Sequence, residues 1–242
     1  MRDLHIGHGL DATRPQTVIH NAADRTVFHP KGGAEWRPGE KMRIVTHHWS
    51  PNFMKGFDIY ERLDQMLDSS PWRDEFEFTV IGNAPLGVGF RNTRRLPPLW
   101  GAELARAIKE NHLYVTAARN EAGGNHYVEA MACGLPVLHL DTGSLPEYCR
   151  PYGIRFTLAD FEQRLLEARE RYAELRQAVK GYTYGAEEMA AEYERVLESV
   201  VAERRAHPRP PAGLGARVGY GLKPLRRALG RARRAVGRWI AG

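Results

Sequence analysis

The sequence predicts an α/β fold in which helices cover both sides of a parallel sheet. Short apolar runs typical of buried strands alternate with longer segments whose apolar residues recur every three or four positions. Such alternation is typical of parallel strands joined by right-handed helical crossovers. Because ligands bind at the carboxyl ends of the strands in such sheets, the polar and glycine-rich segments that follow the strands are the candidate binding residues.

The predicted elements begin after a polar N-terminus. Residues 1–17 lack a clear period and are predicted to be linker-like, and residues 18–204 are predicted to form one Rossmann-like domain. Short apolar runs predict strands at residues 17–19, 43–47, 76–81, 113–117, 137–140 and 154–156.

The predicted helices follow from apolar residues that share one helical face. Phe57, Tyr60, Leu63 and Leu67 predict the first of these helices, and residues 102–110 predict the next one, after a loop at residues 82–98. The apolar spacing over residues 161–175 predicts one long amphipathic helix, and a last helix follows Gly185.

The composition supports a folded protein and excludes several classes. An apolar fraction of 43% in 242 residues is enough for a core. The two cysteines, Cys133 and Cys149, do not form the disulfide framework of a secreted domain. The N-terminus lacks the apolar core of a signal peptide, and no apolar run approaches the roughly 20 residues of a membrane-spanning helix. We therefore expect a cytoplasmic protein.

The net charge of +6 hides an uneven distribution. Residues 203–242 hold eleven Lys and Arg against the single acid Glu203, a net charge of +10, so the other residues carry −4. The basic character is thus a property of the tail, and no nucleic-acid partner is expected for the domain.

The tail, residues 205–242, begins with a Pro- and Gly-rich break at residues 208–213. Over residues 222–240, apolar side chains recur at three- and four-residue intervals and arginines cover the other face, which predicts a basic amphipathic helix. Such a helix suits an anionic membrane surface, which would place the protein peripherally at the inner membrane face. A solvated tail is the alternative.

The segment from Glu121 to Val137 carries the candidate site. Gly123 and Gly124 allow the backbone to approach an anion, and the unpaired amides of the helix that follows favour phosphate. Gly134 is predicted to end that helix. Glu121 and Glu129 are carboxylates that can accept hydrogen bonds from sugar hydroxyls. The segment therefore predicts a site for a sugar linked to a diphosphate.

The spacing of Glu121 and Glu129, followed by the run AMACGLPV, resembles the donor-binding motif of GT-B glycosyltransferases of family 4, the group 1 glycosyl transferases. Residues 18–30 resemble the linker motif that enters the second domain of these enzymes, and Lys55-Gly56-Phe57-Asp58 resembles their phosphate-binding lysine turn. The resemblance covers about residues 15–200. It implies a single GT-B half, the C-terminal donor-binding one, without the acceptor-side half.

The resemblance implies retaining, metal-independent transfer of a hexose from a nucleotide diphosphate sugar, with no cofactor. It implies that Lys55 contacts the diphosphate, that Glu121 contacts the donor sugar near its reacting face, and that Glu129 contacts the ribose. These roles make Glu121 and Lys55 the candidate catalytic residues. The candidate donor-binding residues are Lys55, Gly123, Gly124, Asn125 and Glu129.

The chain departs from the family pattern in two places. No arginine precedes Lys55 within residues 46–52, so the second phosphate contact falls to a histidine, to Asn52 or to backbone amides. The family more often has Gly-Phe-Gly after the first glutamate, where this chain has Ala122-Gly123-Gly124. This difference predicts a changed pocket shape with its amides retained.

Other chemistries lack support in the sequence. His47 and His48 are adjacent on a predicted strand and point to opposite faces, so we expect no metal site. Residues 87–89 lack the full dinucleotide fingerprint, and residues 142–144 are not a nucleophile elbow but a loop near the sugar. Two functions remain open. One is a glycosyltransferase whose acceptor side is supplied by a separate domain or chain, and the other is a non-catalytic nucleotide-sugar binding or assembly module.

Overall fold

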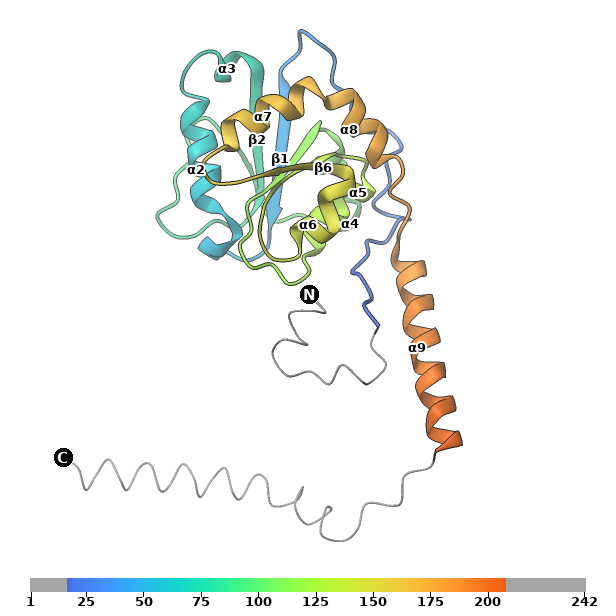
Figure 1. Ribbon diagram of the computed structural model, residues 1–242. Helices are drawn as coiled ribbons and strands as arrows, with labels where there is room; N and C mark the ends of the chain where they lie inside the picture. Colours follow the sequence, from blue (N-terminus) through green and yellow to red (C-terminus); the bar gives the residue numbers. More distant parts are fainter. Residues whose placement is uncertain (1–16, 208–242) are drawn as a thin grey trace, which may run out of the picture. The chain divides into compact units, whose positions relative to one another are not determined.

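Six parallel strands form one sheet in the computed structural model, which describes residues 17–207 (Figure 1). The strand order is β3-β2-β1-β4-β5-β6. The chain therefore runs outward from β1 to β3 and returns to continue at β4, which is the order of a Rossmann-like fold. The predicted fold class is confirmed. The strands are β1 (Met42–His48), β2 (Phe76–Gly82), β3 (Arg94–Leu96), β4 (Leu113–Thr116), β5 (Val137–Leu140) and β6 (Gly153–Phe156).

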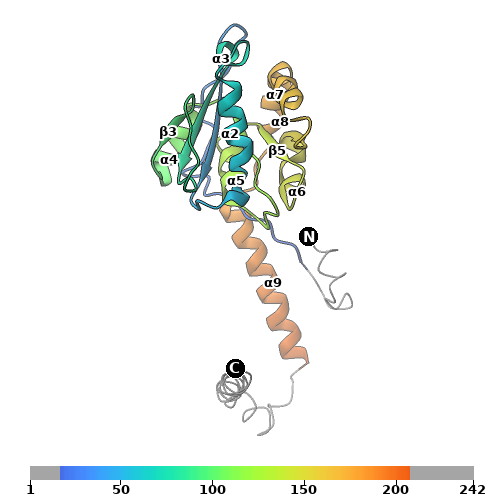
Figure 2. The same ribbon diagram turned by 90° about the vertical axis from the view of Figure 1, so that its left-hand side faces the viewer.

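Helices cover both sides of this sheet, with α2 and α7 on one side and α4 on the other (Figure 2). Arg62 of α2 pairs with Glu162 of α7 at 2.8 Å. The helices are α2 (Phe57–Met66), α3 (Trp72–Glu75), α4 (Gly101–Lys109), α5 (Asn125–Ala132), α6 (Leu145–Cys149), α7 (Phe161–Glu170), α8 (Tyr172–Val179) and α9 (Ala186–Ala206). Two short 3-10 helices, η1 (Phe53–Lys55) and η2 (Arg150–Tyr152), complete the set in the described residues.

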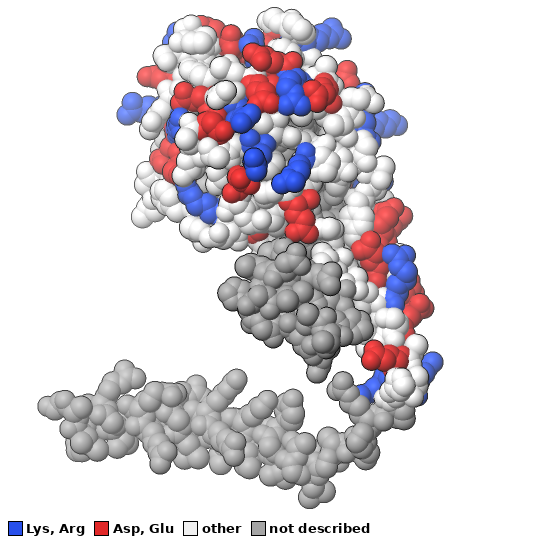
Figure 3. Space-filling view, viewed as in Figure 1, with Lys and Arg blue, Asp and Glu red and all other residues white. Residues whose placement is uncertain are grey.

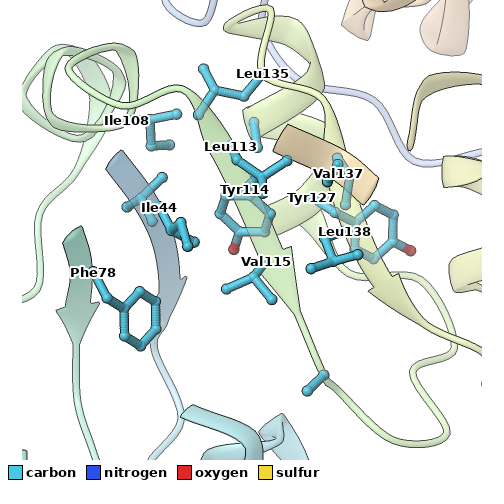
Figure 4. Close-up of a cluster of buried hydrophobic side chains, with 14 of the residues drawn as sticks. Ile44, Phe78, Ile108, Leu113, Tyr114, Val115, Tyr127, Leu135, Val137 and Leu138 are labelled. Carbon is cyan, nitrogen blue, oxygen red and sulfur yellow. The ribbon is translucent and has the colours of Figure 1, made fainter. Parts of the chain in front are cut away.

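The core lies along β1 and β4, the two central strands. Ile44, Leu113 and Tyr114 are fully buried there, and Phe78 and Val137 extend the core into the neighbouring strands (Figure 4). These two strands are buried along nearly their whole length because both faces are covered. The hydroxyl of Tyr114 is satisfied by the backbone amide of His47, 3.1 Å away.

The outer surface over α7 and α8 has charges of both signs (Figure 3). Within these helices Arg164 pairs with Glu167, and Arg171 pairs with both Glu167 and Glu174. Exposed pairs of this kind contribute little to stability, and they identify the outer face as solvated.

Three predicted elements need correction. Residues 17–19 form no strand, because the segment is held instead by Asn21, which bonds the loop at Gly123. The predicted helix over residues 161–175 is broken at Arg171 into α7 and α8. The apolar spacing keeps its period through the break, so it could not reveal the break. The predicted loop over residues 82–98 contains β3, whose two arginines are exposed.

The described residues divide into two compact units after Glu194, so α9 begins in the first unit and ends in the second. The predicted domain limits at residues 17 and 204 stay predictions. The predicted basic helix at residues 222–240 lies outside the described residues, as do residues 1–16. No helix within residues 17–207 is long and apolar enough to cross a membrane.

Candidate functional site

Lys55 is placed by a tight turn that follows β1. The side chain of Asn52 caps this turn by accepting the amide of Met54 at 2.9 Å. Gly56 ends it with a φ of 89°, a left-handed conformation that favours glycine. A Cβ at Gly56 would lie 2.5 Å from the carbonyl carbon and oxygen of Ala117, which follows β4. The lysine turn therefore packs directly on the end of the neighbouring strand.

Glu121 stands on the loop after β4. Asn120 precedes it in the left-handed region, with a φ of 51°. The carbonyl of Glu121 accepts the amide of Ser144 at 2.8 Å, so the turn at residues 142–144 holds the backbone of this loop. The Lys55 ammonium lies 2.5 Å from a Glu121 carboxylate oxygen. Two residues that are 66 positions apart thus meet at the carboxyl ends of β1 and β4.

Helix α5 begins at Asn125, directly after the two glycines. The first amides of a helix, here those of Asn125 and His126, have no partner within the helix. Gly124 has no side chain that could accept a hydrogen bond from them. The amide of Gly124 itself donates to the Tyr127 hydroxyl at 2.9 Å. The carbonyl of Gly123 accepts the Asn21 side chain, also at 2.9 Å. Asn125 and His126 are therefore the amides best placed for an anion.

The end of α5 follows the prediction. Gly134 has a φ of 83°, and the next amide, that of Leu135, donates back to the carbonyl of Ala130 at 3.0 Å. This is the Schellman pattern of a glycine-terminated helix. Gly134 therefore closes the helix, and the chain enters β5 at Val137.

Glu129 lies one turn into α5 and is held by a histidine. The His47 ring, at the carboxyl end of β1, lies 2.8 Å from a Glu129 carboxylate oxygen. The side chains are 7% and 20% exposed, and the contact with His47 uses one of the two Glu129 carboxylate oxygens. The sequence did not predict this pair.

Two further histidines, His48 and His126, line the pocket as neutral groups. His48 contacts the hydroxyl of Tyr60 at 2.8 Å, and His126 contacts that of Thr116 at 3.0 Å. Burial lowers the pKa of both imidazoles well below the usual value, and the positive charge of Lys55 adds to this effect. Burial also raises the pKa of Tyr60 to about 12. The permanent positive charge of the pocket is therefore that of Lys55.

A cavity of about 360 Å³ brings these groups together. Four predicted residues line it: Lys55, Gly124, Asn125 and Glu129. Glu121 and Gly123 belong to the adjoining loop, and Glu121 reaches the cavity through Lys55. Its mouth also carries Trp49 and Trp100, whose ring centroids are 4.6 Å apart and whose exposed fractions are 53% and 58%. The sequence analysis did not predict this pair, because Trp100 follows β3, a strand that it did not recognise.

Arg119 is a second residue that the sequence analysis missed. Its guanidinium binds both carboxylate oxygens of Asp58, at 2.9 and 2.5 Å, and its backbone amide donates to the Met54 carbonyl at 2.7 Å. This pair holds the pKa of Asp58 below its ordinary value, although partial burial opposes the shift. Arg119 therefore ties the loop of Glu121 to the turn of Lys55.

The described residues contain no group of three or more His, Cys, Asp or Glu side chains that could hold a metal ion. His47 and His48 instead have hydrogen-bond partners in Glu129 and Tyr60.

A family model described as Glycosyl transferases group 1 matches residues 91–189. The resemblance to this family is confirmed. The part of this chain that matches the family model contains Glu121, the helix α5 and Glu129, whereas Lys55 precedes the matched part. No curated protein matches the chain in sequence.

Solved structures agree in fold. Sucrose-phosphate synthase from Thermosynechococcus elongatus is 15% identical with a TM-score of 0.62, and the match covers 84% of this chain and 57% of that one. A chain of the GtfA/B complex is 17% identical with a TM-score of 0.62, and the match covers 82% of this chain and 43% of that one. The pneumococcal O-GlcNAc transferase GtfA, in complex with UDP and GlcNAc, is 14% identical with a TM-score of 0.59. This match covers 83% of this chain and 44% of that one. The chain thus spans about half of the length of these structures.

Proposed function

We propose that the chain is the donor-binding half of a retaining, metal-independent glycosyltransferase that takes a hexose from a nucleoside diphosphate sugar. One observation carries the proposal. The ammonium of Lys55, the first amides of α5 and the carboxylate of Glu129 all border one cavity at the carboxyl ends of β1 and β4. This is the position at which such sheets bind ligands.

The proposed diphosphate lies between Lys55 and the start of α5. The helix dipole and the amides of Asn125 and His126 favour a negative charge there. Lys55 now pairs with Glu121, and a bound diphosphate would take over this ammonium. Glu121 would then be released to accept hydrogen bonds from the sugar, while Lys55 stabilises the charge that grows on the leaving diphosphate.

The proposed nucleoside lies toward the two tryptophans. Each presents a wide exposed aromatic surface beside the cavity, and base–aromatic stacking contributes about 1–3 kcal/mol. Glu129 would accept hydrogen bonds from the ribose hydroxyls, and its contact with His47 keeps the carboxylate in place.

Replacing Glu129 by alanine is expected to weaken binding of a nucleoside diphosphate and of its sugar conjugate alike. The reason is that both ligands contain the same ribose. The measurement is calorimetry, in which the unchanged chain and the Glu129→Ala variant are each titrated with a ribonucleotide and with its deoxyribose analogue. Equal affinity of the unchanged chain for the two nucleotides would contradict the role of Glu129.

The experiment that tests the proposed function is a thermal-shift screen against UDP, GDP, ADP and their sugar conjugates. A ligand that binds the folded state raises the melting temperature in proportion to the logarithm of its concentration. We expect one nucleotide and its sugars to raise the melting temperature more than the others. No shift with any ligand at millimolar concentration would reject the proposal.

Transfer by this chain also requires an acceptor site. We propose that a separate domain or chain supplies it, because the chain spans about half of the length of the matched structures. A nucleotide-sugar binding or assembly module is the second proposal, and it follows from the same fact.

The proposed location is the cytoplasm, with residues 222–240 at an anionic membrane surface.

A further inference from the structure

A second cavity, of about 770 Å³, lies at the opposite end of the strands from the candidate donor site. Arg43 is near the start of β1 and Arg94 begins β3, and the last turn of α4 completes the wall. Figure 2 shows β3 and α4 at this side of the sheet. Arg43 and His48 are five residues apart on β1, which is roughly 16 Å in a strand. This cavity is therefore separate from the donor pocket.

Positive charge is concentrated around this cavity, although the chain before residue 203 has a net charge of −4. Its lining includes five cationic side chains and two acidic ones, Glu77 and Glu110. Arg94 and Glu110 are 3.8 Å apart and are 64% and 53% exposed, so solvent screens this pair and Glu110 neutralises little of the charge. The five cations are Lys31, Arg43, Arg94, Arg106 and Lys109.

Hydrogen bonds fix the segments that carry these cations. The Arg43 guanidinium donates to the carbonyl of Glu110 at 2.7 Å, which joins β1 to the end of α4. Lys109 donates to the carbonyl of Lys31 at 3.2 Å, and the carbonyl of Lys109 accepts the amide of Ala34 at 2.8 Å. Three distant stretches of sequence thus form a defined wall.

Arg106 and Lys109 are three residues apart on α4 and therefore share one face of the helix. Among the described residues, Arg106 forms no ion pair. Arg94 lines the same cavity from β3, and its one ion pair within residues 17–207 is the 3.8 Å contact to Glu110. The guanidiniums of Arg94 and Arg106 are free to bind an anion from two sides, and their planar donor groups suit phosphate or sulfate.

We propose that this cationic groove binds a small soluble anion that carries several phosphate or sulfate groups. Its volume lies within the roughly 300–1,000 Å³ of small-molecule sites. Several cations around one cavity favour a multiply charged ligand over a single monoanion, because each contact adds a charge-assisted hydrogen bond. The site is additional to the donor pocket and does not depend on the proposed function.

The test is calorimetric titration of the full chain with inorganic tripolyphosphate at physiological salt. The double variant Arg94→Gln/Arg106→Gln is expected to lose the tightest binding event, with an affinity at least about tenfold lower. The matched control is Arg95→Gln, because Arg95 is exposed on the same strand and does not line the groove. The basic tail is the same in every variant, so its contribution cancels in the comparison.

Lys55→Ala separates this site from the donor pocket and is expected to retain the tripolyphosphate event. Circular dichroism melts check that each variant is folded. Three results would overturn the proposal: no binding to the unchanged chain, the same titration curve for the double variant and the unchanged chain, or loss of the event in Lys55→Ala alone. A loss in Arg95→Gln as large as in the double variant would also overturn it.

Discussion

Replacing Lys55 by alanine is expected to weaken nucleoside diphosphate binding by about tenfold to a hundredfold, because a hydrogen bond to a charged group contributes about 1.5–3 kcal/mol. Among the described residues that line the cavity, Lys55 is the one Lys or Arg, and the lining histidines His48 and His126 are neutral at pH 7. Its loss also leaves the Glu121 carboxylate, which is 15% exposed, without a cation near the incoming diphosphate. Calorimetry with the nucleotide selected by the thermal-shift screen measures the loss.

Two further variants give this result its meaning. Lys41→Ala is the matched control, because Lys41 is an exposed lysine that precedes β1, whereas Lys55 follows it. The double variant Lys55→Ala/Glu121→Ala shows how much of the loss comes from the uncovered carboxylate, because it removes that repulsion. Unchanged affinity in Lys55→Ala would reject the role of Lys55 at the diphosphate.

The sequence predicted that Lys55 and Glu121 would each follow a strand, but it did not predict that the two side chains would meet. Each follows a buried strand, and neighbouring parallel strands end at the same edge of a sheet. Their meeting depends on the order of the strands, in which β1 and β4 are neighbours, and the sequence analysis did not predict this order. The limits of α5 were also readable, because the glycines on both sides of the helix have distinct backbone roles.

The contacts that shape the pocket could not be predicted from the sequence. The pairing of His47 with Glu129 depends on which side-chain rotamers fit between β1 and α5, and the sequence spacing does not encode this choice. Arg94 of the groove lies on β3 and Trp100 follows this strand, which is a three-residue edge strand without an apolar pattern. The link from Arg119 to Asp58 joins a loop to the first turn of α2, and the periodicity of the helix gives no information about a partner in a loop.

The second large effect is expected at Gly56. Gly56→Ala is expected to lower the free energy of unfolding by about 2–5 kcal/mol, because a left-handed residue costs about 1–2 kcal/mol and overpacking about 1–3 kcal/mol. The new methyl group would meet the backbone of Ala117, which cannot move aside as a flexible side chain could. Urea denaturation followed by circular dichroism measures the change.

Gly39→Ala separates the two contributions to the loss at Gly56. Gly39 has a similar φ of 93°, but a Cβ there would meet no atom within 4 Å. This control is expected to cost only the conformational part, about 1–2 kcal/mol. Equal losses at the two glycines would show that the turn of Lys55 does not depend on its contact with β4. A larger loss at Gly56 would show that close packing on Ala117 holds the turn of Lys55. The same packing then sets the distance between Lys55 and Glu121. Gly56 variants that stay folded should therefore bind nucleoside diphosphates weakly.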